Sequence, residues 1–128
     1  KIPYFFLSDE PCYMIQLAPF MSTNIVKWPG ILIGGHMPIN IWPRILNWGF
    51  EWVDTEKDLK IRRGDHLCYF KFETESLRTS VNLFELEYTE ELKEYRKGLS
   101  ATPKFMSNTF SLFETAYKRR PKKLLRKK

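Results

Sequence analysis

The side chains that could hold a metal ion are few in this chain. It has two histidines, His36 and His66, and Asp65 directly precedes the second. A cupin-like site needs several His and carboxylate ligands on facing strands, commonly with two His separated by one residue. That spacing is absent, but His36, Asp65 and His66 could meet if their strands pair. We expect two surface histidines without a metal or cofactor, and keep a cupin-like metal-dependent enzyme as the alternative.

Two cysteines, Cys12 and Cys68, could act as a nucleophile or form a disulfide. Both lie in apolar, strand-like runs, where a free cysteine usually behaves as a small hydrophobic side chain. Cys68 and His66 share a strand face, but no third group is evident that would orient the histidine as a base. We therefore predict two reduced, buried thiols and no catalytic residue.

Four tryptophans could form a stacking platform for sugars or bases. They are Trp28, Trp42, Trp48 and Trp52. Because they alternate with polar residues as the inner face of a strand does, one aromatic layer of the core is the favoured interpretation. A ligand platform stays open as the alternative.

The last eleven residues, Lys118–Lys128, contain eight of the 21 Lys and Arg residues and none of the 15 acids. The other 117 residues hold 13 basic and 15 acidic side chains, a net charge of −2 against +6 for the whole chain. Because Pro121 interrupts helical structure, we predict a separable electrostatic module that binds nucleic acid or another polyanion. A solvated tail without a ligand is the equally weighted alternative. The candidate polyanion-binding residues are Lys118, Arg119, Arg120, Lys122, Lys123, Arg126, Lys127 and Lys128.

The length and the aromatic content indicate the architecture that positions these residues. A chain of 128 residues corresponds to one domain, which we place at residues 1–117 with the basic tail at 118–128. Aromatic residues make up 16% of the chain and favour strands. We predict a mainly antiparallel β-sandwich or roll of about seven or eight strands, closed by two C-terminal helices.

The expected strands are apolar or alternating runs between turn residues. They are Ile2–Leu7, Cys12–Ala18, Ile31–Ile33, Ile39–Trp42, Leu46–Val53, Leu59–Thr74 and Ser80–Tyr88. In the run that ends at Thr74, a turn at Gly64 precedes an alternation that places Phe70 and Phe72 in the core.

The period then changes to that of helices. One helix should begin at Thr89 and end at Gly98, which is a common stop residue. A second should run from about Pro103 or Ser107 to Arg120, with an apolar stripe that packs on the sheet. The residues of that stripe are Met106, Phe110, Phe113 and Tyr117.

Two stretches, Trp42–Glu51 with its Asn-Trp-Gly-Phe-Glu sequence and Ile61–Glu73 with its Gly-Asp turn, resemble a family of proteins. These are uncharacterised small β-rich proteins of tailed phages, especially marine ones, and their bacterial relatives. The family often has Pro at the position of His66, which argues against His66 as a required ligand. The resemblance implies no activity. We therefore expect a phage-encoded, non-enzymatic binding or accessory protein that acts through a protein partner.

The sequence also gives an expectation about location. No run reaches the roughly 18 apolar residues of a membrane span, and no signal-peptide pattern opens the chain. We expect a cytoplasmic protein, in the host cytoplasm or the virion if a phage encodes it. The start at Lys1, directly before an apolar run, fits a processed or truncated N-terminus.

Overall fold

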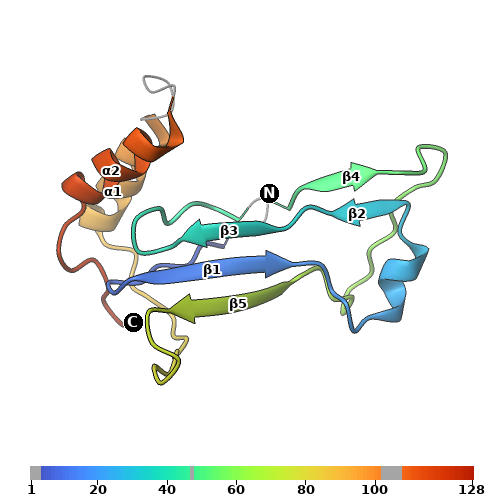
Figure 1. The fold of residues 1–128 in the computed structure, drawn as a ribbon, viewed down its shortest axis with the longest axis horizontal. Helices are drawn as coiled ribbons and strands as arrows, with labels where there is room; N and C mark the ends of the chain where they lie inside the picture. The colour runs from blue at the N-terminus through green and yellow to red at the C-terminus, as the bar shows by residue number, and fades with distance from the viewer. Residues whose placement is uncertain (1–3, 47, 102–107) are drawn as a thin grey trace.

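The computed structural model describes residues 4–46, 48–101 and 108–128. Its elements are β1 (Cys12–Leu17), the 3-10 helix η1 (Thr23–Lys27), β2 (Gly30–Leu32), β3 (Gly35–Pro38), β4 (Phe50–Trp52), β5 (Tyr69–Thr74), α1 (Glu90–Ala101) and α2 (Thr109–Arg119). The molecule is elongated (Figure 1). The two helices and the C-terminus lie at one end, and the β2–β4 pair lies at the other.

The strands form two antiparallel sheets, one of three strands in the order β3-β1-β5 and one made of β2 and β4. The expectations of antiparallel strands and of two C-terminal helices are therefore confirmed, but the fold is mixed rather than mainly β. The expectation of a seven- or eight-stranded sandwich is wrong, because the described part of the chain has five strands.

Three of the expected strands fail for identifiable reasons. The backbone N–H groups of Ile41 and Trp42 both donate to the Pro38 carbonyl, so Ile39–Trp42 is mostly turn. Within Ser80–Tyr88 only Leu86 forms a bridge, because no second long strand lies beside it. Residues 4–7 have no strand partner either, and residues 1–3 lie outside the described residues.

Strand β1 is the centre of the larger sheet, and its side chains alternate between a buried and an exposed face. Cys12, Met14 and Gln16 are buried, while Tyr13 and Leu17 on the other face are exposed. Met14 lies opposite Phe72 of β5, and the apolar cluster around it contains Ile39 and Leu46. The side of β5 that faces the core was therefore predicted correctly. Phe70 and Phe72 are half-buried rather than fully buried.

Helix α1 begins as predicted, with the Thr89 hydroxyl accepting from the Leu92 N–H at 3.2 Å. It does not end at Gly98, because Leu99 is buried in the core cluster and its packing carries the helix on to Ala101. In α2 the predicted stripe is wrong, since Phe110 and Tyr117 are exposed. The face toward the core contains Leu112, Phe113 and Ala116, and Met106 lies outside the described residues.

The helices pack on Trp42 and Leu124, which belong to loop segments, rather than on the face of a sheet. No helix among the described residues is long and apolar enough to cross a membrane.

Candidate interaction surfaces

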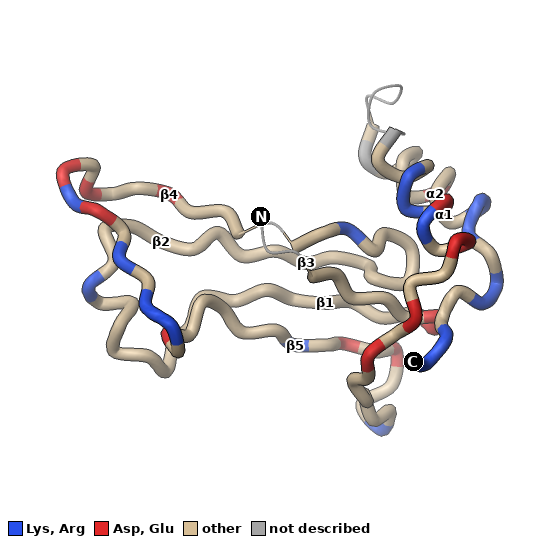
Figure 2. Tube along the Cα trace, turned by 180° about the vertical axis from the view of Figure 1, so that it is seen from behind, with Lys and Arg blue, Asp and Glu red and all other residues tan. Residues whose placement is uncertain are grey.

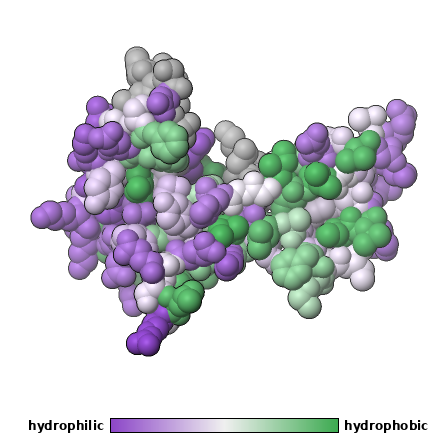
Figure 3. Space-filling model, in the orientation of Figure 1, coloured by the Kyte–Doolittle hydropathy of each residue, from purple (hydrophilic) through white to green (hydrophobic). Residues whose placement is uncertain are grey.

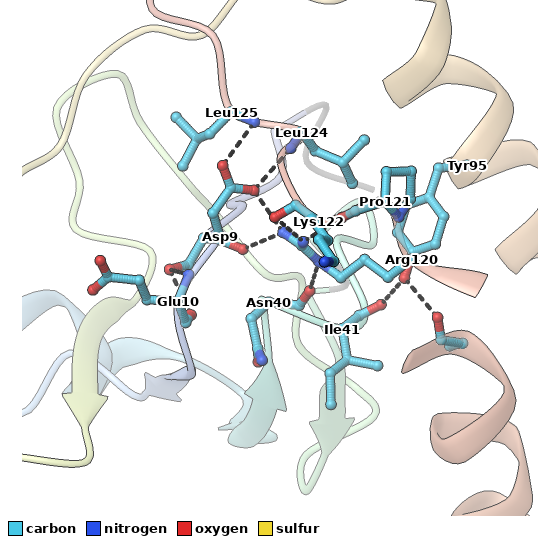
Figure 4. Close-up of polar contacts among 12 residues, drawn as sticks. Asp9, Glu10, Asn40, Ile41, Tyr95, Arg120, Pro121, Lys122, Leu124 and Leu125 are labelled. Carbon is cyan, nitrogen blue, oxygen red and sulfur yellow. Dashed lines mark hydrogen bonds and ion pairs between the residues drawn. The ribbon is translucent and has the colours of Figure 1, made fainter. Parts of the chain in front are cut away.

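Asp9 fixes the C-terminal segment to the body of the protein (Figure 4). Its carboxylate forms an ion pair with Arg120 at 2.7 Å and accepts the backbone N–H groups of Leu124 at 2.9 Å and Leu125 at 3.1 Å. The side chains of Arg120 and Asp9 are only 7% and 20% exposed. A carboxylate and a guanidinium at such depth are stable only with their hydrogen bonds satisfied.

Those hydrogen bonds are present on both partners. Besides Asp9, the Arg120 guanidinium donates to the carbonyls of Ser8 and Pro121, each at 2.7 Å, and to that of Asn40. Burial raises the pKa of Asp9, but the hydrogen bonds from Leu124, Arg120 and Leu125 and the Arg120 charge together hold it below its ordinary value. Asp9 therefore stays ionised in the folded protein to a lower pH than an ordinary aspartate.

The chain beyond Arg120 continues as a docked segment. Leu124 is 2% exposed and belongs to the helix core cluster. The Glu87 N–H donates to the Arg126 carbonyl at 2.8 Å, and the Lys128 N–H donates to the Glu85 carbonyl at 3.1 Å. The expectation that Lys118–Lys128 is separable from the fold is therefore wrong: Lys118 and Arg119 end α2, and the rest packs on the body.

The eight basic side chains of this segment are not equivalent. Lys118 is paired with Glu114 at 2.7 Å, Lys128 with Glu85 at 2.6 Å, and Arg120 with Asp9. The other five lie at the surface and have no ion pair to a described carboxylate. These five are Arg119, Lys122, Lys123, Arg126 and Lys127. From the sequence, Arg120 is one of the candidate polyanion-binding cations, and no sequence pattern marks Asp9 as its partner.

The candidate metal ligands are not gathered into a site. The His36 ring lies against Tyr13 on the exposed face of the larger sheet, with 4.6 Å between ring centroids. The ring centroids of His66 and Tyr69 lie 6.1 Å apart. The Asp65 carboxylate accepts a hydrogen bond from the Asn24 side-chain amide at 2.7 Å. Among the described residues no three His, Cys, Asp or Glu side chains are close enough to hold one metal ion.

The two cysteines are free, as predicted, with Cys12 buried and Cys68 half-buried. Burial raises the pKa of each thiol above its ordinary value. A raised pKa keeps the sulfur protonated near neutral pH and therefore disfavours a nucleophilic role.

Three of the four tryptophans come together through Phe50. Trp48 stacks on Phe50 with 5.3 Å between ring centroids, Trp28 approaches Trp48 at 5.7 Å, and Trp52 approaches Phe50 at 5.3 Å. Gly30 on the neighbouring strand has to be a glycine, because a Cβ there would clash with the Glu51 carbonyl oxygen and would also lie 2.8 Å from the Phe50 ring. Trp42 packs instead on Phe113 in the helix core, so a platform of all four does not form.

Apolar side chains project into solvent around β2, β4 and η1, at the end of the molecule away from the helices (Figure 3). We call this the hairpin surface. Its residues are Phe20, Met21, Val26, Ile31, Ile33, Trp52 and Val53. The Ile31 side chain is 60% exposed and that of Val53 is 76% exposed. Monomeric soluble proteins rarely expose several large apolar side chains in one region.

Comparisons with protein-family models, with curated proteins and with solved structures gave no match.

Proposed function

We propose that this chain is a non-enzymatic binding or accessory protein that acts through protein contacts, with the hairpin surface as its contact site. The resemblance to small phage proteins makes a phage-encoded accessory role the natural setting. The observation that carries the proposal is the exposed apolar surface at the β2–β4 end. Exposed apolar side chains gathered at one end of a molecule mark sites of protein association.

The total surface supports the same proposal. The chain has 9900 Å² of accessible surface, whereas a compact monomer of 15.4 kDa should have about 7,200 Å². The difference is about 2,700 Å². Obligate homodimers remove about 1,000–2,500 Å² from each chain, and their interfaces are more apolar than those of transient complexes. We therefore propose a second copy of this chain as the first partner of the hairpin surface.

The strand arrangement favours this partner too. A sheet of two strands is marginally stable alone, and here each strand has only three residues. Both strands are edges, because each has one neighbour in the sheet. Packing against the same surface of a second copy would bury the apolar side chains and give the two-stranded sheet the packing contacts that it lacks alone.

Sedimentation equilibrium of the purified protein between about 1 and 50 µM tests the proposal. We expect a dimer that the double substitution Ile31→Lys and Val53→Lys dissociates, since both side chains are exposed and Lys at position 31 would lie opposite Glu51 without charge repulsion. The control is Phe110→Lys on α2, an apolar residue that is 84% exposed and lies outside the hairpin surface. A wild-type monomer at the highest concentration, or a dimer that both variants leave unchanged, contradicts the proposal.

A further inference from the structure

A second surface lies at the opposite end of the molecule, where α1, α2 and the C-terminus meet (Figure 2). Lys and Arg gather there and again along the loops around β2 and β4, with few charges between. At the C-terminal end, a hollow is lined by Lys123, Arg126 and Lys127 together with Phe84. We call these four residues the basic hollow. Asp9, which also lines it, is neutralised by Arg120 and by the Leu124 and Leu125 N–H groups.

The cations of the basic hollow are held in place rather than carried on a mobile tail. The buried Leu124 anchors the segment, and the two backbone hydrogen bonds to Glu85 and Glu87 fix the chain around Lys127. A ligand that binds such a segment does not have to order it first, so less conformational entropy is lost on binding.

An aromatic groove adjoins the basic hollow. Phe84 lines both, and the groove, with a volume of about 560 Å³, also contains Tyr4, Phe5 and Tyr88. Glu85 lines the groove too, and its carboxylate is paired with Lys128 at 2.6 Å. Phe84 is 42% exposed, and the Lys127 ammonium lies 4.7 Å from the centre of its ring. Exposed rings beside cations without acidic partners can bind bases by stacking and phosphates by charge at the same time.

We propose that the basic hollow and the adjoining aromatic groove form a binding site for single-stranded nucleic acid. The phosphates lie against Lys123, Arg126 and Lys127, and at least one base stacks on Phe84. A duplex offers phosphates but no free base faces, and an anionic membrane offers no planar bases. The aromatic groove therefore favours the single strand over both.

Fluorescence anisotropy with a labelled thymidine oligonucleotide of about 15 residues tests this site, because single-strand sites span roughly 4–16 nucleotides. In the triple variant Lys123→Gln, Arg126→Gln and Lys127→Gln, we expect a loss of affinity of tenfold or more. Each phosphate contact to a single strand contributes about −0.7 to the log–log salt slope, so the slope should become less steep by about 2.

The matched control removes the same three charges at the other end of the molecule, by Lys60→Gln, Arg62→Gln and Arg63→Gln. It should leave affinity and slope nearly unchanged. Equal losses in the two triple variants would mean that net charge alone drives binding, and would overturn the site.

The base contact has its own test. Phe84→Leu keeps an apolar side chain but removes the ring, and should weaken oligonucleotide binding several-fold while leaving heparin retention unchanged. The control is Phe110→Leu, which removes an exposed ring on α2. The single-strand assignment would be overturned if Phe84→Leu left the affinity for the oligonucleotide unchanged, or if the protein bound a duplex of equal length more tightly. Binding to vesicles with about 30% phosphatidylserine but to no oligonucleotide would show a membrane ligand instead.

Discussion

Replacing Asp9 by Asn should destabilise the protein and release its C-terminal segment. One amide oxygen can still accept from Arg120 and Leu124, but the amide NH₂ then faces the Leu125 N–H, a donor against a donor. Removing one partner of a buried ion pair costs about 3–5 kcal/mol. Because Asp9 is 20% exposed and Arg120 keeps its carbonyl acceptors, we expect a loss of about 2–3 kcal/mol in the free energy of unfolding.

Urea denaturation followed by tryptophan fluorescence measures this loss, and its pH dependence tests the cause. The folded-state pKa of Asp9 lies below the ordinary 3.8, so its ionised form stabilises the fold above that pH. The stabilisation is lost as pH falls through the folded-state value. The difference between wild type and Asp9→Asn should therefore be constant from pH 7 to about 4 and shrink at lower pH.

Asp54→Asn is the matched control, since Asp54 pairs with Lys57 at the same 2.7 Å distance but at the surface. We expect no measurable change in stability from it. The reasoning is refuted if Asp9→Asn unfolds within about 0.5 kcal/mol of the wild type, or if its penalty is the same at pH 3 as at pH 7.

Three further predictions concern the core and the C-terminal segment. Tyr95→Phe should lower the free energy of unfolding by about 1 kcal/mol, because it removes the hydroxyl that donates to the Ile41 carbonyl at 2.7 Å. Burial raises the pKa of Tyr95 to about 12, so the free energy of unfolding of the wild type, measured with urea, should fall as the pH rises from 10 toward 12. Phe70→Ala should cost about 2–3 kcal/mol by urea unfolding, less than for a fully buried ring, because Phe70 is half-buried against Phe6; a cost under about 1 kcal/mol would contradict its assignment to the core face. A chain that ends at Tyr117 should lose cooperative thermal unfolding, because it lacks Arg120 and Leu124; an unchanged melting curve would show that the docked segment contributes nothing.

Local patterns in the sequence predicted the parts of the fold that local physics decides. The apolar run Cys12–Ala18 identified β1, and the alternation of His66–Thr74 identified β5 and the face that it turns inward. Alternation in Ser80–Tyr88 was misleading, because a strand also needs a partner and only Leu86 has one. Gly98 was misread for a similar reason, since the burial of Leu99 outweighs the low helix propensity of one glycine.

The C-terminal segment shows what counting charges cannot supply. Eight cations in eleven residues indicate a solvated tail when they are considered alone. The single acid that changes this interpretation, Asp9, lies 111 residues before Arg120. No pattern within a short window could connect them, and the exposed apolar residues at the hairpin surface equally could not be told from core residues by their type.

The contact between Asp9 and Arg120 also sets the order in which a newly made chain can reach its final form. A ribosome adds about 5–20 residues per second and releases the N-terminal part first. Strand β1 begins three residues after Asp9 and emerges early, but the helix core is not closed until Leu124 has been synthesised. During that interval Trp42 and Leu92 lack the contact with Leu124, and transiently exposed apolar surface of this kind favours aggregation. Because contacts between residues so far apart in sequence form slowly, we expect this closing step to limit the rate of folding in the cell.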